Sequence, residues 1–261
     1  MATNSTHTET PTVGLNADLG ESFGAWKMGM DEALLQIIDS ANIACGFHAG
    51  DPLVMRNTIR TAKANNVDIG AHPSFPDLQG FGRRNMVMAP DELEAAIIYQ
   101  IAALDGMAKA EGARVVHVKA HGALNNMAAA DYALAQVVAR AIHAYDPSLV
   151  LLSPALSQLS RAGKEQGLRV AEEAFADRAY EEDGSLVSRS KPGAMIHGAE
   201  ASLAHVKRML ESGGLISASG KVLSTPIHSI CVHGDGPDAV NTARLLRDSL
   251  RAEGYTLKGL A

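Results

Sequence analysis

The chain has 261 residues, of which 46% are hydrophobic, 20% charged and 4% aromatic. This composition is typical of a globular protein and excludes a disordered chain, a collagen-like repeat and a short peptide module. With 23 Lys and Arg against 29 Asp and Glu, the formal net charge is −6. An acidic chain is poorly suited to neutralising a phosphate backbone, so we do not expect nucleic acid as a partner.

Cysteine usage and the chain start predict a cytoplasmic location. The two cysteines, Cys45 and Cys231, lie far apart in a chain too large to need disulfide stapling, so we expect reduced thiols. The first residues, MATNSTHTETPT, lack both the basic and the apolar segments of a secretory signal. No apolar run approaches the length of a membrane span, so no membrane association is expected.

Short apolar runs alternate with stretches of helical spacing along the chain. Residues 1–12 are polar and aperiodic and are predicted to be a flexible tail, followed by a single domain over residues 13–261. Predicted buried strands cover residues 13–16, 42–44, 67–70, 115–119, 149–152, 168–171 and 229–232. Predicted helices cover residues 31–38, 52–65, 90–111, 131–145, 157–166, 199–212 and 238–252. The polar connection over residues 175–196 is predicted to be irregular.

This alternation predicts an α/β fold. Seven strand and helix units without a low-complexity linker favour a closed, seven-stranded β/α barrel of the TIM type. An open doubly wound sheet is the alternative, but the first strand is not followed by the G-x-G-x-x-G pattern of a dinucleotide site.

Glycine and histidine, with 24 and 10 copies, gather just after the predicted strands. The five clusters are NADLGESFG (16–24), CGFHAGD (45–51), GAHPSFPDLQGFGRR (70–84), KAHGALNN (119–126) and CVHGDGP (231–237). Loops after the strands of a β/α barrel open on one face, where such enzymes keep their chemistry. We therefore expect the clusters to form one pocket. His7, His143 and His205 lie outside them and are predicted to be surface residues.

The clustered side chains are compatible with two kinds of chemistry. Asp18, His48, His72 and His121 are of the type that binds a divalent metal, but they could equally serve as general acid, general base and oxyanion donors without one. Lys119 could donate a proton or hold an anion. Arg83 and Arg84 are either a solvated pair or an anion site, and Asp235 precedes a helix whose free N–H groups attract anions.

Six ordered motifs, LNADLGESFG, NIACGFHAGDP, GAHPSFPDLQGFGRR, KAHGALNN, FADRAY and CVHGDGPDAV, resemble the LamB/YcsF family over nearly the whole chain. The resemblance implies a seven-stranded β/α barrel related to the glycoside hydrolase and polysaccharide deacetylase barrels. Bacterial members serve as the A subunit of ATP-dependent 5-oxoprolinase, which opens the lactam of 5-oxoproline (pyroglutamate) to L-glutamate. The chain lacks the phosphate-loop motif, which fits partner subunits B and C activating the lactam with ATP.

The resemblance also suggests roles for the clustered residues. Asp18 or His72 would activate water, while His48 and His121 would hold that water or bind an optional divalent metal. Lys119 would neutralise the substrate's carboxylate or phosphate together with Arg178. The expected catalytic residues are Asp18, His48, His72, Lys119 and His121, the expected substrate-binding residues are Asn16, Glu21, Arg83, Arg84, Arg178, His233 and Asp235, and the expected metal ligands are Asp18, His48 and His72.

Some positions depart from the family pattern. Ala120 replaces a proline, Asn125 a tyrosine, Ser188 a proline and Gly236 a threonine, which puts substrate fit and loop rigidity in question more than chemistry. Two other functions therefore stay open. One is a metal-dependent deacetylase or amidohydrolase, and the other is a substrate-binding subunit without catalysis.

Overall fold

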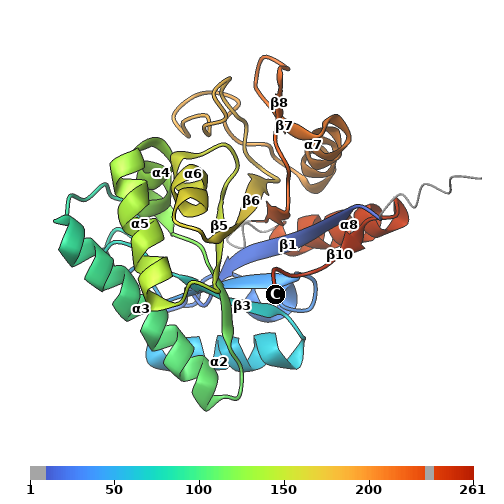
Figure 1. Ribbon diagram of the computed structural model, residues 1–261. Coiled ribbons are helices and arrows are strands. Elements are labelled where there is room, and N and C mark those ends of the chain that lie inside the picture. Colours follow the sequence, from blue (N-terminus) through green and yellow to red (C-terminus); the bar gives the residue numbers. More distant parts are fainter. Residues whose placement is uncertain (1–9, 233–237) are drawn as a thin grey trace, which may run out of the picture.

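Seven parallel strands close into a barrel within residues 10–232 and 238–261, the part of the chain that the computed structural model describes. The ring closes because β1 pairs with β2 on one side and with β9 on the other. This confirms the predicted barrel, which Figure 1 shows with its helices around it. The barrel strands are β1 (Thr12–Leu19), β2 (Ser40–Ala44), β3 (Asp68–His72), β4 (Val115–Val118), β5 (Val150–Pro154), β6 (Arg169–Phe175) and β9 (Ser229–Cys231).

The helices pack around the barrel and agree with the predicted segments, with two differences. α1 ends four residues earlier than predicted, and α4 was not expected because its sequence, GALNNMAAA, begins inside a loop motif. Asp51 starts α2 as predicted, since its side chain accepts hydrogen bonds from the N–H groups of Leu53 and Val54. The helices are α1 (Asp31–Leu34), α2 (Pro52–Ala64), α3 (Pro90–Ala110), α4 (Gly122–Ala130), α5 (Tyr132–Tyr145), α6 (Gln158–Glu165), α7 (Ala199–Ser212) and α8 (Ala239–Ala252).

The chain leaves the barrel between β6 and β9. Its first part, up to residue 198, is irregular as predicted, and α7 and an antiparallel hairpin of β7 (Gly214–Ile216) and β8 (Val222–Ser224) follow. In Figure 1 this excursion stands on one side of the barrel. The prediction that His205 lies on the surface is wrong, because the residue is only 4% exposed and its ring stacks on Tyr180.

A short last strand, β10 (Thr256–Leu257), pairs with the start of β1 at Thr12 and Val13. Thr12, the last residue of the predicted tail, is therefore already part of β1. Residues 1–9 lie outside the described part of the chain, so the division into a tail and one domain stays a prediction.

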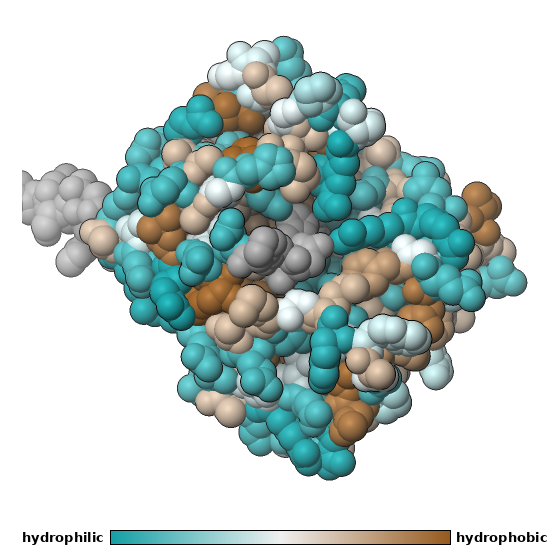
Figure 2. Space-filling model, turned by 180° about the vertical axis from the view of Figure 1, so that it is seen from behind, coloured by the Kyte–Doolittle hydropathy of each residue, from teal (hydrophilic) through white to brown (hydrophobic). Residues whose placement is uncertain are grey.

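The surface mixes polar and apolar residues. On the face seen in Figure 2, hydrophobic side chains form small separate groups among hydrophilic ones, as is usual for protein surfaces. Within the described residues, we find no helix that combines the length and the apolar character needed to cross a membrane.

Polar side chains fill part of the barrel interior. Lys119 follows β4 but contacts Asp18 of β1 and Glu173 of β6, and these strands are not neighbours in the sheet, so the contacts cross the inside of the barrel. Alternate residues of a strand point to opposite faces, which places apolar residues such as Leu15 and Ala17 of β1 toward the helices. The barrel thus presents its chemistry inward.

Candidate active site

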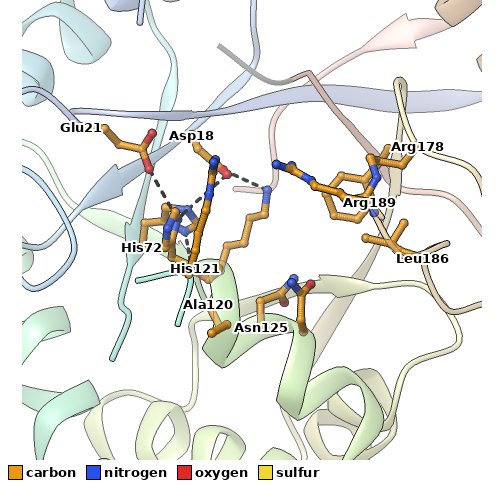
Figure 3. Close-up of a pocket in the computed structure, with 15 residues that line it drawn as sticks. Asp18, Glu21, His72, Ala120, His121, Asn125, Arg178, Leu186 and Arg189 are labelled. Carbon is orange, nitrogen blue, oxygen red and sulfur yellow. Dashed lines mark hydrogen bonds and ion pairs between the residues drawn. The ribbon is translucent and has the colours of Figure 1, made fainter. Parts of the chain in front are cut away.

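A pocket of about 230 Å³ lies where the carboxyl ends of the barrel strands meet. It brings together residues from the predicted loop clusters, including Asp18, Glu21, His72, Lys119 and His121. Figure 3 shows Glu21 and the two histidines on one side of the pocket, with Arg178 and Arg189 across from them. Glycine-marked loops after separate strands therefore do converge, as their positions predicted.

Lys119 is the central cation of the site. Its ammonium is 2.9 Å from Asp18 Oδ1, 2.9 Å from Glu173 Oε1 and 3.2 Å from Cys231 Sγ. Burial lowers the pKa of Lys119, but Asp18, Cys231 and Glu173 outweigh it and raise the pKa well above its usual value. Lys119 is therefore protonated at neutral pH and can donate a hydrogen bond but cannot act as a base.

Asp18 is an ionised carboxylate shared between three donors. Its Oδ1 accepts hydrogen bonds from Lys119 and, at 2.8 Å, from Asn42, and its Oδ2 lies 3.3 Å from His72 Nε2. Burial raises the pKa of Asp18, but the charges of His72 and Lys119 lower it more, so that it lies well below the usual range.

His72 and His121 face each other in a way that calls for a cation. His72 Nδ1–H donates to the carbonyl of Lys119 at 2.7 Å, and His121 Nε2–H donates to the carbonyl of Phe81 at 2.9 Å. A carbonyl only accepts, so these bonds assign the ring protons. The two remaining nitrogens, 3.0 Å apart, both present lone pairs when the rings are neutral. A shared proton or a metal ion between them relieves this repulsion.

Glu21 and His48 complete a set of four metal-type donors with these rings. His48 stacks on His121 with centroids 3.7 Å apart, and its Nε2 lies 3.1 Å from Glu21 Oε1. One donor atom from each of the four residues lies within 4.8 Å of the others. Burial lowers the pKa of His121 to about 3 and that of His48 well below its usual value, so both rings are neutral, as metal ligands must be. Three nitrogens and one carboxylate suit a zinc-type divalent ion.

This set differs from the expected ligands Asp18, His48 and His72. Glu21 and His121 join the two expected histidines, whereas Asp18 is committed to Lys119 and Asn42. Glu21, expected to bind substrate, is thus placed among the donors. The reason is local, because Glu21 lies two residues beyond the end of β1, where the loop turns toward the histidines.

A buried polar layer supports the site from below. Asn16 donates to Ser229 at 2.8 Å, and Asn42 bridges Asn16 and Asp18. His117 Nε2 lies 2.8 Å from Asn42 Oδ1, and its ring packs so closely on Gly70 that a Cβ there would lie 2.0 Å from it. Asn16, expected to bind substrate, is fully buried in this layer and can act on a substrate only through its neighbours.

Backbone contacts fix the loop that carries His121. Its N–H donates to the carbonyl of Pro73, and the next helix turn is tied to Gly82, whose carbonyl accepts from Ala123 N. Gly82 has φ of +63°, and a Cβ there would lie 2.8 Å from both His121 and His48. Only glycine allows this close approach.

Guanidinium groups form the opposite side of the pocket. Arg83, Arg178 and Arg189 line it, whereas Arg84 binds Asp77, with Nε 2.9 Å from Oδ1. Of the predicted pair, the structure therefore brings Arg83 to the pocket and engages Arg84 in a loop ion pair. Arg189 was not singled out in the sequence because it lies in the irregular connection.

Other predictions can be placed as well. Ala120 and Asn125, two departures from the family pattern, both line the pocket. Both cysteines are free and buried, and burial raises the pKa of Cys45 to about 12 and that of Cys231 well above its usual value. The expected substrate-binding residues His233 and Asp235 lie outside the described residues.

Glu173, Asn42, His117 and Arg189 are the site residues that sequence reasoning missed. Spacing was the available signal for two of them, since His117 lies two residues before Lys119 and Asn42 two before Ala44 at the strand end, as inward-facing residues of a strand do. Nothing comparable marked Arg189.

Similar proteins share most of this chain. The family model of the LamB/YcsF family matches residues 13–261. Relatives named as the A subunit of 5-oxoprolinase are 62% identical over 95% of this chain and 97% of their own in Azoarcus sp. (strain BH72), and 47% identical over 95% and 97% in Bacillus subtilis (strain 168).

Solved structures agree with the fold. The crystal structure of the lactam utilization protein from Thermus thermophilus superposes with a TM-score of 0.90 at 40% identity, over 95% of this chain and 100% of that one. A family 4 carbohydrate esterase from Streptomyces lividans matches with a TM-score of 0.50 at 12% identity, over 96% of this chain and 92% of its own, which is a likeness of fold alone. The matched residues and the shared barrel place the chain in the LamB/YcsF family.

Proposed function

We propose that this chain is the A subunit of an ATP-dependent 5-oxoprolinase, which opens the lactam of 5-oxoproline to L-glutamate. Relatives that carry this name cover nearly the whole chain at high identity. The observation that carries the proposal is the division of the pocket into a side of imidazole and carboxylate groups and a side of guanidinium groups, with Lys119 between them. A small cyclic amide with a carboxylate has the complementary halves.

ATP enters through chemistry that this chain leaves to others. An amide carbon is a poor electrophile, and transfer of the γ-phosphoryl group of ATP to the carbonyl oxygen, with release of ADP, makes it a better one. We assign this step to partner subunits B and C, in a cytoplasmic complex. Water then attacks the activated carbon, the ring C–N bond breaks, and phosphate and glutamate are the products.

The pocket residues suit the hydrolytic half of the reaction. Asp18 and His72 are the groups that can accept the proton of the attacking water, and protonated Lys119 donates to the oxygen on which negative charge develops. Arg83 and Arg178 neutralise the anionic groups of the substrate. His48 and His121 hold the water.

A divalent metal fits the same pocket. Glu21, His48, His72 and His121 would hold it, and a bound ion would polarise the carbonyl and lower the pKa of water. We expect zinc affinity to fall at least tenfold in His121→Ala and much less in Asp18→Ala. Competition with a chromogenic chelator measures both affinities, and circular dichroism checks the fold. Equal losses in the two variants would show that Asp18 is itself a ligand.

The function is tested by reconstitution. The purified chain is mixed with subunits B and C, 5-oxoproline and ATP, and glutamate is measured. We expect glutamate that depends on all components and is lost in Asp18→Ala. No glutamate, while a working complex of a relative runs in parallel, would refute the proposal.

The donor cluster also favours a second candidate, metal-dependent amide hydrolysis by this chain alone. Cleavage of an N-acetyl sugar that needs zinc but not ATP would support it. Full activity of the complex after removal of the pocket histidines would instead indicate a subunit that only binds substrate.

A further inference from the structure

A second cavity adjoins the catalytic pocket. Its volume is about 540 Å³, against about 230 Å³ for the pocket, and the two share Arg178, Arg189, Leu186 and Asn126 as walls. The smaller volume lies below the range of typical ligand pockets and the larger one within it. The pair therefore offers room for a ligand larger than a lactam, or for two groups side by side.

Arg178 is the unusual residue of this boundary. The residue is only 7% exposed, and one of its terminal nitrogens donates to the carbonyl of Val187 at 2.8 Å. Its buried Nε has no hydrogen-bond partner within the described residues. Burying a guanidinium with an unused donor is costly, and a bound anion would supply the missing acceptor.

A second guanidinium stands close to the first. Arg189 lines both cavities, and Figure 3 shows the two arginines on the same side of the catalytic pocket. Burial and the charge of Arg189 both lower the pKa of Arg178, and Asp177 offsets part of this effect. Two cations on one wall repel each other, so this arrangement favours an anion between them.

A helix start adds to the positive character of the second cavity. Ser157 and Gln158, the N-cap and first residue of α6, line it, and free N–H groups at a helix start attract anions. Asp183 is the acidic residue on the wall, but its carboxylate already accepts hydrogen bonds from the N–H and hydroxyl of Ser185.

We propose that the second cavity is a binding site for a phosphoryl-type oxyanion, held by Arg178, Arg189 and the start of α6. The paired guanidiniums suit such an anion because they donate several hydrogen bonds in fixed directions. Binding of the anion does not depend on the proposed function. That its source is the phosphoryl group of the activated lactam does rest on that function.

The test titrates inorganic phosphate into the purified full chain by isothermal calorimetry. We compare Arg189→Gln and Arg178→Lys with Lys191→Gln, a matched control in which the lost cation lies on the same connection but pairs with Glu181 at the surface. We expect the control to bind phosphate like the wild type and both arginine variants to bind it at least tenfold more weakly. Arg189 is exposed, so its variant should fold even if the Arg178 variant does not.

Two further arms separate the sources and the sites. Tighter binding of ATP than of phosphate, lost in Arg189→Gln, would identify a nucleotide phosphoryl group, and equal or weaker binding would identify a free or lactam-borne one. Binding of phosphate together with 5-oxoproline supports a separate cavity. The proposal is overturned if the wild type shows no saturable binding, if the arginine variants match the control, or if 5-oxoproline displaces phosphate. Failure to form glutamate leaves all these outcomes readable.

Discussion

His117 should make the protein sensitive to acid. The residue is fully buried in the barrel, and burial lowers its pKa to about 3 from an ordinary value near 6.5. Below pH 6.5 the unfolded chain takes up a proton on this ring while the folded chain does not, so the free energy of unfolding falls as the pH falls. Each pH unit costs about 1.4 kcal/mol, which amounts to about 2 kcal/mol at pH 5.

The assay compares wild type with His117→Asn and His117→Gln in metal-free buffer. Urea unfolding is followed by far-ultraviolet circular dichroism between pH 7 and pH 4, because the single tryptophan, Trp26, is 75% exposed and a poor probe of the core. Both variants should be less stable at pH 7 but show a slope smaller by about 1.4 kcal/mol per pH unit. An unchanged slope in both variants would refute the assignment of a neutral, buried imidazole.

Three further predictions concern local contacts. Gly82→Ala should abolish activity and lower stability because its Cβ would strike the pocket histidines, whereas Gly24→Ala, also at positive φ but in open space, should cost only about 1 kcal/mol, as thermal unfolding can show. Glu173→Gln should move the alkaline limb of kcat/KM to lower pH, because it removes a carboxylate that raises the pKa of the pocket lysine; Glu172→Gln, the neighbouring buried carboxylate on the other face of β6, should leave that limb in place, and equal shifts would contradict the role. Asp51→Ala should lower the free energy of unfolding by about 1 kcal/mol through loss of the α2 cap, measured in urea, and a stability equal to wild type would argue against that cap.

The barrel could be predicted from the sequence because its strands are buried on both faces and appear as apolar runs. The prediction of β6 shows the limit. It stopped at Ala171, yet the strand continues to Phe175 through Glu172 and Glu173. Two adjacent carboxylates look like a strand end, but Glu173 pairs with Lys119 inside the barrel and Glu172 with Ser160 outside it. These partners are distant in sequence, so no local pattern could reveal them.

Much the same holds for the site. Glycine and histidine after each strand indicated which loops meet, and the structure brings His48, His72, Lys119 and His121 together. Which atom faces which depends on ring protons set by the carbonyls of Phe81 and Lys119, and on Asp18 turning to Lys119. Such choices come from tertiary contacts and could not be predicted from spacing.

The closure of the ring sets the order in which the pocket can form during synthesis. β1, which carries Asp18, is among the first segments to leave the ribosome, but its partner β9 pairs Gly14 with Ser229 and is among the last. Until β9 is made, β1 has a free edge and Lys119 lacks its contact with Cys231. The nascent chain therefore has to keep an unfinished barrel protected until almost the whole protein has been translated.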